Sequence, residues 1–407
     1  MDNKEELKDL KEEYLKLKSK LEKLNEEDLE YVTSENVMLN EIYERVFDAG
    51  TYTELDEKFA DDYFKETFDQ WEKDGLCTAV CKVTKDGTMM IGRNMDLTIC
   101  NKAAYVVRTN IEGNYKTIGL AFTFRPVSPD YDSVIKKGIT PEFQKVLPFL
   151  CDDVLNEKGL YIEVNMRNGE TWPTGATKFG CSGTNPKSSK RVYLFQLSRY
   201  IGEHCATVDE AIEYVKTLDL YSMYGHEIHS DNYCFMIADA TGHYGVMEFA
   251  LNQMIWHDYQ QAQANFYLDK NLYAIQTLKA GVGRYNAVME GIKDVETKED
   301  MYKLMDSVSY FQTYFPDKCK FDNRSEFTGF IPFWTFDYLM NEINVEDFKT
   351  MTRYAQKYIE GKSMQELRDI GTLWQSVFTE VVDCNSRTIF VRFYEDESKT
   401  LTLGFDE

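Results

Sequence analysis

The chain has 407 residues, and its 69 Asp and Glu side chains outnumber its 46 Lys and Arg side chains, which gives a formal net charge of −23. Because contacts to phosphate backbones need clustered basic side chains, this balance argues against a nucleic-acid binder, and no run of about 18 apolar residues is present that could span a membrane. The nine cysteines are scattered, and the polar first residues lack the apolar segment of a secretory signal, so we expect a cytoplasmic protein without a disulfide framework.

Residues 1–76 form an acidic segment, with 24 acidic and only 11 basic side chains. Apolar residues recur in its first part at alternating spacings of three and four, at Leu7, Leu10, Tyr14, Leu17, Leu21 and Leu24. This spacing predicts a helix whose apolar side packs against another helix of the chain. Further helical patterns are expected over residues 36–47 and 55–72. We therefore interpret residues 1–76 as an acidic helical arm that precedes a second domain, residues 77–407.

A β-hairpin is predicted directly after this arm. Residues 77–84 alternate in the manner of a strand, Asp86 and Gly87 are a typical pair of turn residues, and residues 88–93 fit the returning strand. The hairpin brings the start of its first strand beside the end of its second.

The turn also predicts which residues of the hairpin pair. With a two-residue turn, Cys77 lies opposite Asp96, and directly opposed side chains share a face of the sheet. Arg93 then lies opposite Val80 on the other face, so it reaches the same site only if the second strand bulges or ends between residues 93 and 96. A different turn would shift this register by one residue.

Beyond the hairpin, strand-like and helix-like segments alternate. Strands are expected at 103–109, 116–124, 160–166, 232–239, 244–250, 374–382 and 387–394, and residues 399–404 are a candidate for another. Helices are expected at about 188–204 and 207–217, the second opened by a capping box of Thr207 and Glu210, and in a late zone at about 286–370. No linker rich in Pro, Gly or Ser divides residues 77–407, which indicates one domain of helices and antiparallel strands.

Cys77 has the most distinctive potential chemistry in the chain. If it becomes the first residue of a chain, its thiol is a nucleophile, and its α-amine, with an ordinary pKa of about 7.7–8.0, is a general base. A carboxylate such as Asp96 can orient that amine, and a guanidinium such as Arg93 favours the thiolate. Without context, the three residues are more simply a core thiol, a turn acid and a solvated base.

The wider sequence gives that context. Cys77-Thr78, followed by Gly92-Arg-Asn-Met-Asp96, resembles the start of the mature choloylglycine hydrolase family, whose members are linear-amide hydrolases with an N-terminal nucleophile. The later segments that resemble this family, in the same order, are Asn156-Glu-Lys-Gly-Leu160 with Asn165, Thr207-Val-Asp-Glu-Ala211, Met236-Ile-Ala-Asp-Ala-Thr-Gly242, Asn265-Phe-Tyr-Leu268, Gly283-Arg-Tyr285 and a strand hairpin from Trp374. The likeness runs through essentially all of residues 77–407.

The resemblance implies roles for three residues of the hairpin. Cys77 would be the nucleophile and, through its α-amine, the base. Asp96 would hold that amine, and Arg93 would lie beside the thiol.

Three later residues complete the implied site. Asn165 and Asn265 would frame the oxyanion, and Arg284 would support the network of charges. Considered alone, the asparagines also fit turn or strand-end amides, and Arg284 also fits a surface ion pair.

The resemblance also implies a fold and a reaction. The fold is α+β, a four-layer αββα N-terminal-nucleophile (Ntn) hydrolase sandwich of antiparallel sheets between helices. The reaction is hydrolysis of a linear, non-peptide amide through an acyl-enzyme on Cys77, without a metal or organic cofactor. The partner is a small-molecule N-acyl amide, such as a conjugated bile salt, penicillin V or a fatty-acid amide, and association into a homo-oligomer is left open.

The arm departs from the bacterial bile salt and penicillin V hydrolases, in which only an initiator Met typically precedes the cysteine. Here 76 residues precede Cys77, which therefore has an amide nitrogen and no α-amine. This layout resembles acid ceramidase and N-acylethanolamine acid amidase, which cut themselves before the cysteine. Our hypothesis is that the Cys77 thiol attacks the Leu76 carbonyl and that hydrolysis then releases the arm.

Other interpretations stay open. A retained arm favours an inert Ntn-like binding protein, and an amine that outcompetes water for the acyl-enzyme makes an acyltransferase. His226 and His229 are three residues apart rather than four, which makes a metal site a weak candidate, and no histidine has the signature of a Cys–His enzyme. The sequon at Asn323 is best explained by chance, and the aromatic residues within 327–336 are candidates for an acyl pocket.

Overall fold

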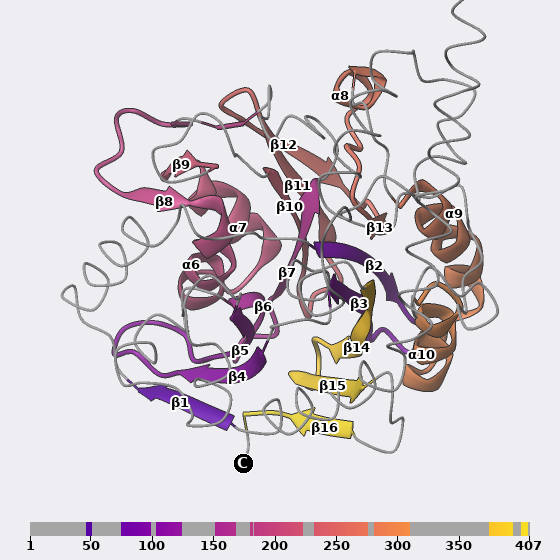
Figure 1. Ribbon diagram of the computed structural model, residues 1–407. Helices are drawn as coiled ribbons and strands as arrows, with labels where there is room; N and C mark the ends of the chain where they lie inside the picture. Colours follow the sequence, from indigo (N-terminus) through magenta and orange to yellow (C-terminus); the bar gives the residue numbers. More distant parts are fainter. Residues whose placement is uncertain are drawn as a thin grey trace, which may run out of the picture.

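Two β-sheets lie face to face at the centre of this computed structural model (Figure 1). The structure describes residues 46–50, 75–98, 103–123, 151–167, 180–181, 183–222, 232–275, 281–309, 374–393 and 400–405. Within this part of the chain, the larger sheet has eight strands in the order β1-β4-β5-β6-β7-β10-β11-β12. The smaller sheet has six, in the order β13-β2-β3-β14-β15-β16.

The strands of the larger sheet are β1 (Val46–Gly50), β4 (Ala103–Thr109), β5 (Thr117–Thr123), β6 (Cys151–Asn156), β7 (Tyr161–Arg167), β10 (Asn232–Ala238), β11 (Tyr244–Ala250) and β12 (Gln253–Asp258). Those of the smaller sheet are β13 (Ala262–Gln263), β2 (Gly75–Val83), β3 (Met89–Thr98), β14 (Trp374–Asp383), β15 (Thr388–Phe393) and β16 (Thr400–Leu403). Every described pair within the two sheets is antiparallel except β1 with β4. A short parallel pair, β8 (Arg191–Tyr193) and β9 (Asp219–Tyr221), stands apart from both sheets.

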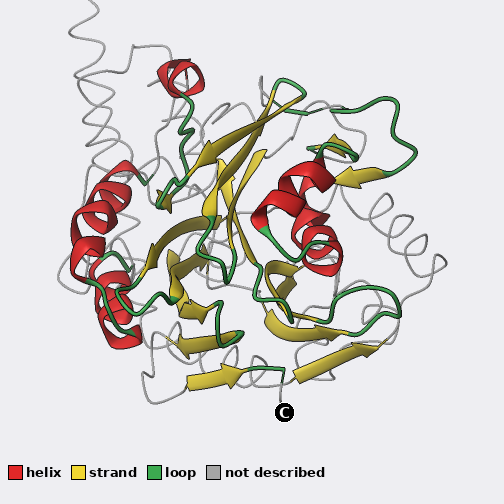
Figure 2. Ribbon diagram, turned by 180° about the vertical axis from the view of Figure 1, so that it is seen from behind, coloured by secondary structure: helices red, strands yellow, loops and turns green. Residues whose placement is uncertain are grey.

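Helices cover the outer face of each sheet (Figure 2). The described helices are η4 (Leu194–Gln196), α6 (Leu197–His204), α7 (Val208–Val215), α8 (Lys270–Ile275), α9 (Val282–Gly291), η5 (Ile292–Asp294) and α10 (Lys298–Ser307). Helix α6 packs on β6 and β7 of the larger sheet, whereas α9 packs on β2 and α10 on β3 and β14 of the smaller sheet. The arrangement is therefore the expected α+β sandwich of four layers.

The two faces of β2 meet different partners, which gives this strand its alternating pattern. Cys77, Ala79 and Cys81 belong to the core between the sheets. Val80 instead packs with Val288 of α9 in a separate core between the smaller sheet and its helices. Because side chains of a strand alternate between its faces, every second residue from Cys77 points into the space between the two sheets.

The predicted register of the β2–β3 hairpin is wrong by one residue. Cys77 pairs with Met95, and Asp96 pairs with Leu76. The turn contains three residues rather than two, because Thr84 still pairs with Thr88 through its N–H, and Gly87 adopts a positive φ of 90°. As a result no bulge is needed to bring Arg93, which lies opposite Ala79, onto the same face as Cys77.

The turn between β6 and β7 is tied to the rest of the molecule by Asn156. Its side-chain oxygen accepts hydrogen bonds from the N–H groups of Lys158 and Leu160, both at 3.0 Å. Its side-chain nitrogen donates to the carbonyls of Gly202 and Cys205, at 2.9 and 2.7 Å, at the end of α6. The Asn156 side chain therefore holds the turn of the Asn156–Leu160 motif and joins it to the end of α6.

Most expected elements of the described part are present, but the short elements β9, β12, β13 and α8 were not expected, and three further differences concern longer segments. The helix expected over 188–204 starts only at Leu194, because the preceding residues form β8. The last two residues of the helix expected over 36–47 belong instead to strand β1, which begins at Val46. Strand β6, which carries two buried aspartates, was not expected. The Thr207 cap is confirmed: its side chain accepts from the N–H of Glu210, whose carboxylate accepts from the N–H of Ala206.

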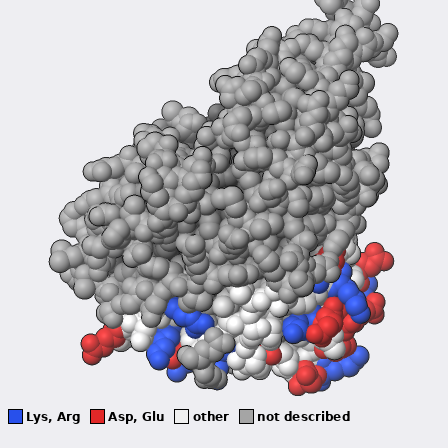
Figure 3. Space-filling model, turned by 60° about the horizontal axis from the view of Figure 1, so that its bottom comes forward, with Lys and Arg blue, Asp and Glu red and all other residues white. Residues whose placement is uncertain are grey.

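Several expectations lie outside the described residues: the apolar seam of residues 7–24, the helical patterns at 55–72 and beyond 309, the His226 and His229 pair, the Asn323 sequon and the aromatic residues at 327–336. The seven described cysteines are buried and are not joined in disulfides. Among the described helices, none is long and apolar enough to cross a bilayer. On the face seen in Figure 3, basic and acidic side chains of the described residues are interspersed.

We expect the Gly159→Ala variant to unfold at lower denaturant than the wild type. Gly159 has a φ of +84°, and a Cβ there would lie 2.3 Å from the carbonyl oxygen of Cys384. Backbone strain and overpacking together predict a loss of about 2–4 kcal/mol. Gly87 has a similar φ of +90° but nothing within 4 Å, so Gly87→Ala measures the backbone contribution alone, about 1 kcal/mol. Equal losses in urea unfolding of the two variants would show that the close approach at Gly159 has no cost.

Candidate active site

Cys77 lies within β2, with its side chain between the two sheets. Only 4% of the residue is exposed, and its Sγ is 3.7 Å from Met95 Sδ and 3.7 Å from Arg93 Nη2. Strand β2 already begins at Gly75, so Cys77 is here an internal residue of a continuous strand. Its thiol is therefore enclosed, but it lies beside a guanidinium.

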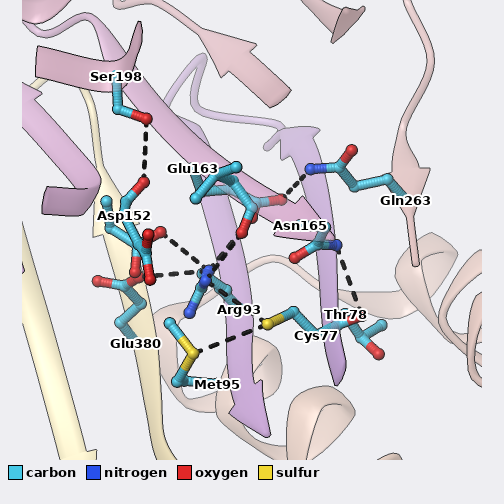
Figure 4. Close-up of polar contacts among 12 residues, drawn as sticks. Cys77, Thr78, Arg93, Met95, Asp152, Glu163, Asn165, Ser198, Gln263 and Glu380 are labelled. Carbon is cyan, nitrogen blue, oxygen red and sulfur yellow. Dashed lines mark hydrogen bonds and ion pairs between the residues drawn. The ribbon is translucent and has the colours of Figure 1, made fainter. Parts of the chain in front are cut away.

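Arg93 is fully buried and is surrounded by carboxyl groups from three strands (Figure 4). Its Nε donates to Glu163 Oε2 at 3.2 Å, and lies 3.0 Å from Asp153 Oδ1 and 4.0 Å from Glu380 Oε1. Its Nη2 donates to the carbonyl oxygen of Val164 at 3.1 Å. One guanidinium of the smaller sheet is thus held by β6 and β7 of the larger sheet.

The three carboxyl groups around Arg93 cannot all be charged at low cost, because one positive charge cannot neutralise three negative charges in a buried site. Burial raises the pKa of Glu163 to about 7, against the opposing effect of Arg93 and of a hydrogen bond from Gln263. Burial raises the pKa of Asp153 well above its ordinary value, and that of Glu380 as well, again opposed by Arg93. The cluster therefore holds protons at neutral pH.

The Cys77 thiol is also protonated at neutral pH in the uncut chain. Burial raises the pKa of this thiol to about 12, although Arg93 acts in the opposite direction. The negative charges of Asp96 and Glu163 add to the rise. A more reactive thiol needs either a nearby base or a more open environment.

A second group of polar side chains surrounds the main chain of Cys77. Arg284 of α9 donates through Nη1 to Cys77 O at 3.1 Å, to Thr78 Oγ1 at 2.5 Å and to Asp96 Oδ2 at 3.3 Å. Asn265 Oδ1 accepts from the Cys77 N–H at 3.1 Å and from Arg284 Nη2 at 3.1 Å. The nitrogen of Cys77 is therefore held by Asn265, and Arg284 links Asn265 to Asp96.

The Asn165 amide lies near the same carbonyl. Its Nδ2 is 3.5 Å from Cys77 O. In the opposite orientation of the amide, the nitrogen would instead donate to Glu163 Oε2 at 3.1 Å and to Val164 O at 3.2 Å. The second orientation gives shorter contacts, so we favour it for the uncut chain, with the amide free to turn toward a ligand.

The five other residues expected from the sequence thus lie around Cys77, but two of them differ in detail. Asp96 does not share a face with the Cys77 side chain, and Asn265 offers its oxygen to the Cys77 nitrogen. Sequence reasoning missed the carboxyl groups behind Arg93: Asp153, Glu163 and Glu380. A signal was available for Glu163, because it interrupts an apolar strand at a position that alternation assigns to the core.

No group of three or more His, Cys, Asp or Glu side chains is arranged to hold a metal ion within the described residues. The polar side chains around Cys77 instead bind one another and the main chain. Their arrangement suits a nucleophile, a neighbouring cation and amide groups that can bind a polarised carbonyl.

Comparison with known proteins assigns a class to this site. Residues 77–274 match the model of the linear amide C–N hydrolases, choloylglycine hydrolase family, and the match begins at Cys77. This region therefore resembles the choloylglycine hydrolase family, as its sequence motifs indicated. The enzyme is a hydrolase of carbon–nitrogen bonds other than peptide bonds in linear amides.

Solved structures similar to this chain include two hydrolases. A mutant of the conjugated bile acid hydrolase from Clostridium perfringens aligns with 14% identity and a TM-score of 0.41, over 81% of this chain and 92% of that one. Penicillin V acylase from Agrobacterium tumefaciens aligns with 10% identity and a TM-score of 0.37, over 81% of this chain and 86% of that one. No curated protein sequence matches.

We expect Arg93→Met to destabilise the protein in a pH-dependent way. Removing one partner of a buried ion pair costs about 3–5 kcal/mol. In the variant, the carboxyl groups are buried without an opposing charge, so their pKa values stay above those of the unfolded chain. Their penalty therefore grows as pH rises from the ordinary carboxyl pKa toward these raised values, and it is absent at low pH, where the carboxyl groups are protonated in both states; in the wild type the pKa of Glu163 is already about 7.

The measurement is the free energy of unfolding relative to wild type at about pH 8 and about pH 5, with the larger loss at the higher pH. The matched control is Arg199→Met, which breaks the buried pair of Arg199 with Glu203 (2.9 Å) in α6, outside the cluster. A loss for Arg93→Met that is the same at both pH values would contradict this account of the cluster.

Proposed function

We propose that the protein is a self-activating cysteine amidohydrolase, in which Cys77 becomes the first residue of the active chain. The observation that supports this most directly is the position of Cys77 Sγ, 3.7 Å from Arg93 Nη2 and at the first residue of the matched family region. A core thiol without function has no need of a buried cation beside it. Residues 1–76 are, in this proposal, an arm that is removed by cleavage.

Activation is a rearrangement of the bond before Cys77. The thiol attacks the carbonyl carbon of Leu76, the carbon–nitrogen bond breaks, and the thiol proton passes to the nitrogen, which leaves a thioester and a free amine. One water molecule then hydrolyses the thioester, giving a carboxylate on Leu76 and restoring the thiol. The neighbouring Asn265 oxygen, 3.1 Å from this nitrogen, is well placed to hold the amine that forms.

The new amine supplies the base that the uncut chain lacks. An α-amine has an ordinary pKa of about 7.7–8.0, so it can take the thiol proton near neutral pH. The thiolate then attacks the substrate carbonyl, the amine of the substrate leaves with a proton, and water hydrolyses the acyl-enzyme. Arg93 favours the thiolate, and the Asn165 amide can turn toward the oxyanion that forms.

The substrate class follows from the family and remains broad. We propose a small N-acyl amide, with an apolar acyl group joined to an amine or amino acid. Conjugated bile acids and penicillin V, named for the two similar structures, are the first compounds to test, followed by fatty-acid amides.

Replacing Cys77 by alanine is expected to prevent both cleavage and hydrolysis. Intact mass should show the wild type losing residues 1–76 while Cys77→Ala keeps them, and release of amine from a panel of N-acyl amides should fall to background. The matched control is Cys81→Ala, because Cys81 is buried on the same face of β2, four residues further along the strand, and lies outside the bond that is cut. That variant should cleave and hydrolyse as the wild type does.

The other outcomes lead to defined conclusions. Wild type that hydrolyses amides while still carrying its first residues would contradict self-activation. Neither cleavage nor hydrolysis across the panel would favour the inert binding protein. Amide exchange that needs an added amine, with little free acid formed, would favour an acyltransferase.

A further inference from the structure

Glu163 lies beside the Arg93 guanidinium, which also approaches the Cys77 sulfur (Figure 4). Its Oε2 accepts from Arg93 Nε at 3.2 Å, and its Oε1 accepts from Gln263 Nε2. The residue is fully buried in β7, on the side of the strand that faces the smaller sheet. It does not contact the thiol and has no part in the reaction steps proposed above.

Glu163 and Cys77 nevertheless compete for one positive charge. The guanidinium is planar and delocalised, so a charge drawn toward Nε by Glu163 is less available at Nη2, which is 3.7 Å from the sulfur. In a buried site such charges are only weakly screened by solvent. An ionised Glu163 thus disfavours the thiolate, and a protonated Glu163 leaves Arg93 free to favour it.

Other ionisable groups also face Glu163. They are Cys77 and Cys81 of β2, Arg93 of β3, Asp153 of β6, Tyr161 of β7 and Glu380 of β14. Burial raises the pKa of Cys81 and of Tyr161 well above their ordinary values, so these two stay neutral in the neutral range. Asp153 and Glu380 also lie near Arg93 Nε, and Glu380 lies on the side of Arg93 away from the Cys77 sulfur in Figure 4.

We propose that Glu163 is a positioning residue that sets the reactivity of Cys77 through Arg93, as a proton-controlled brake on thiolate formation. This proposal rests on the proposed function only in taking Cys77 as the reactive thiol. It goes beyond that function because it assigns a role to a residue that neither attacks nor transfers a proton to the substrate.

The brake has a definite pH dependence. Below about pH 7, Glu163 is protonated and no longer competes with the thiol for the charge of Arg93. Above about pH 7, Glu163 is ionised and raises the pKa of Cys77. The logarithm of the thiolate fraction therefore rises with pH along one line while Glu163 is protonated and along a lower, parallel line once Glu163 is ionised. The change from the first line to the second occurs near the pKa of Glu163.

The test is the rate at which a small uncharged alkylating reagent modifies Cys77 in the full chain from about pH 5 to about pH 9, followed by peptide mass spectrometry. The wild type should show a flattened segment near pH 7 in the logarithm of the rate against pH. Glu163→Gln should give one straight line and react faster than wild type above the segment, by about tenfold for each unit by which Glu163 shifts the thiol pKa.

Two further variants keep the test specific. Glu163→Asp keeps the charge and should keep the flattened segment. Glu203→Gln removes a carboxylate from another buried arginine pair, Arg199 with Glu203, and should also keep it. If cleavage has exposed an α-amine on Cys77, the inflection due to that amine persists in Glu163→Gln, so the loss of the segment identifies Glu163.

The result that overturns the proposal is a straight wild-type line, or a flattened segment that survives in Glu163→Gln. A straight wild-type line is decisive even if Glu163→Gln does not fold. Because the readout is modification of a thiol rather than turnover, it separates the two proposals. The predicted profile without any amide hydrolysis would support Glu163 and contradict the amidase, and hydrolysis with an unchanged profile would do the reverse.

Discussion

The structure depends on one buried guanidinium. Arg93 projects from the smaller sheet into the space between the sheets, where Glu163 and Asp153 of the larger sheet contact its Nε. The same group reaches the Cys77 sulfur with its other end. A charge placed so deep is costly unless it is paired, so the two sheets and the thiol are held in one arrangement by a single side chain. The stability of the sandwich and the chemistry of the thiol therefore cannot be changed independently.

The sequence predicted several of the residues that lie around Cys77, but not their geometry. Spacing within a hairpin and an ordered set of motifs identified Cys77, Arg93 and Asp96. The register was predicted one residue away from the true one, because Asp86-Gly87 is compatible with turns of two or three residues, and only the pairing of the flanking threonines decides between them. A shift of one residue exchanges the faces of all side chains in the strand, which is why Arg93 was expected on the wrong side.

The buried acids were harder to predict for a different reason. Strands in which apolar and polar residues alternate were predicted close to their true bounds. Strand β6 was not predicted, because two adjacent aspartates are typical of solvent-exposed residues. Both are buried, since Asp153 is stabilised by Arg93, which lies 60 positions earlier in the chain. A sequence pattern reports the cost of burying a charge but not the distant partner that compensates for it. The same limitation hides Glu163.

The continuity of β2 across Cys77 has a consequence for the shape of a processed protein. Gly75 and Leu76 form ladder pairs with Leu97 and Asp96, so the bond before Cys77 lies in the body of a strand rather than in a loop. If that bond is cut and the two residues depart, the main-chain groups at the end of β3 lose their neighbours. An open length of sheet edge, about two residues long, would then lie next to the new amino group. An amide that enters there would find unpaired peptide groups ready to align its carbonyl before the sulfur attacks.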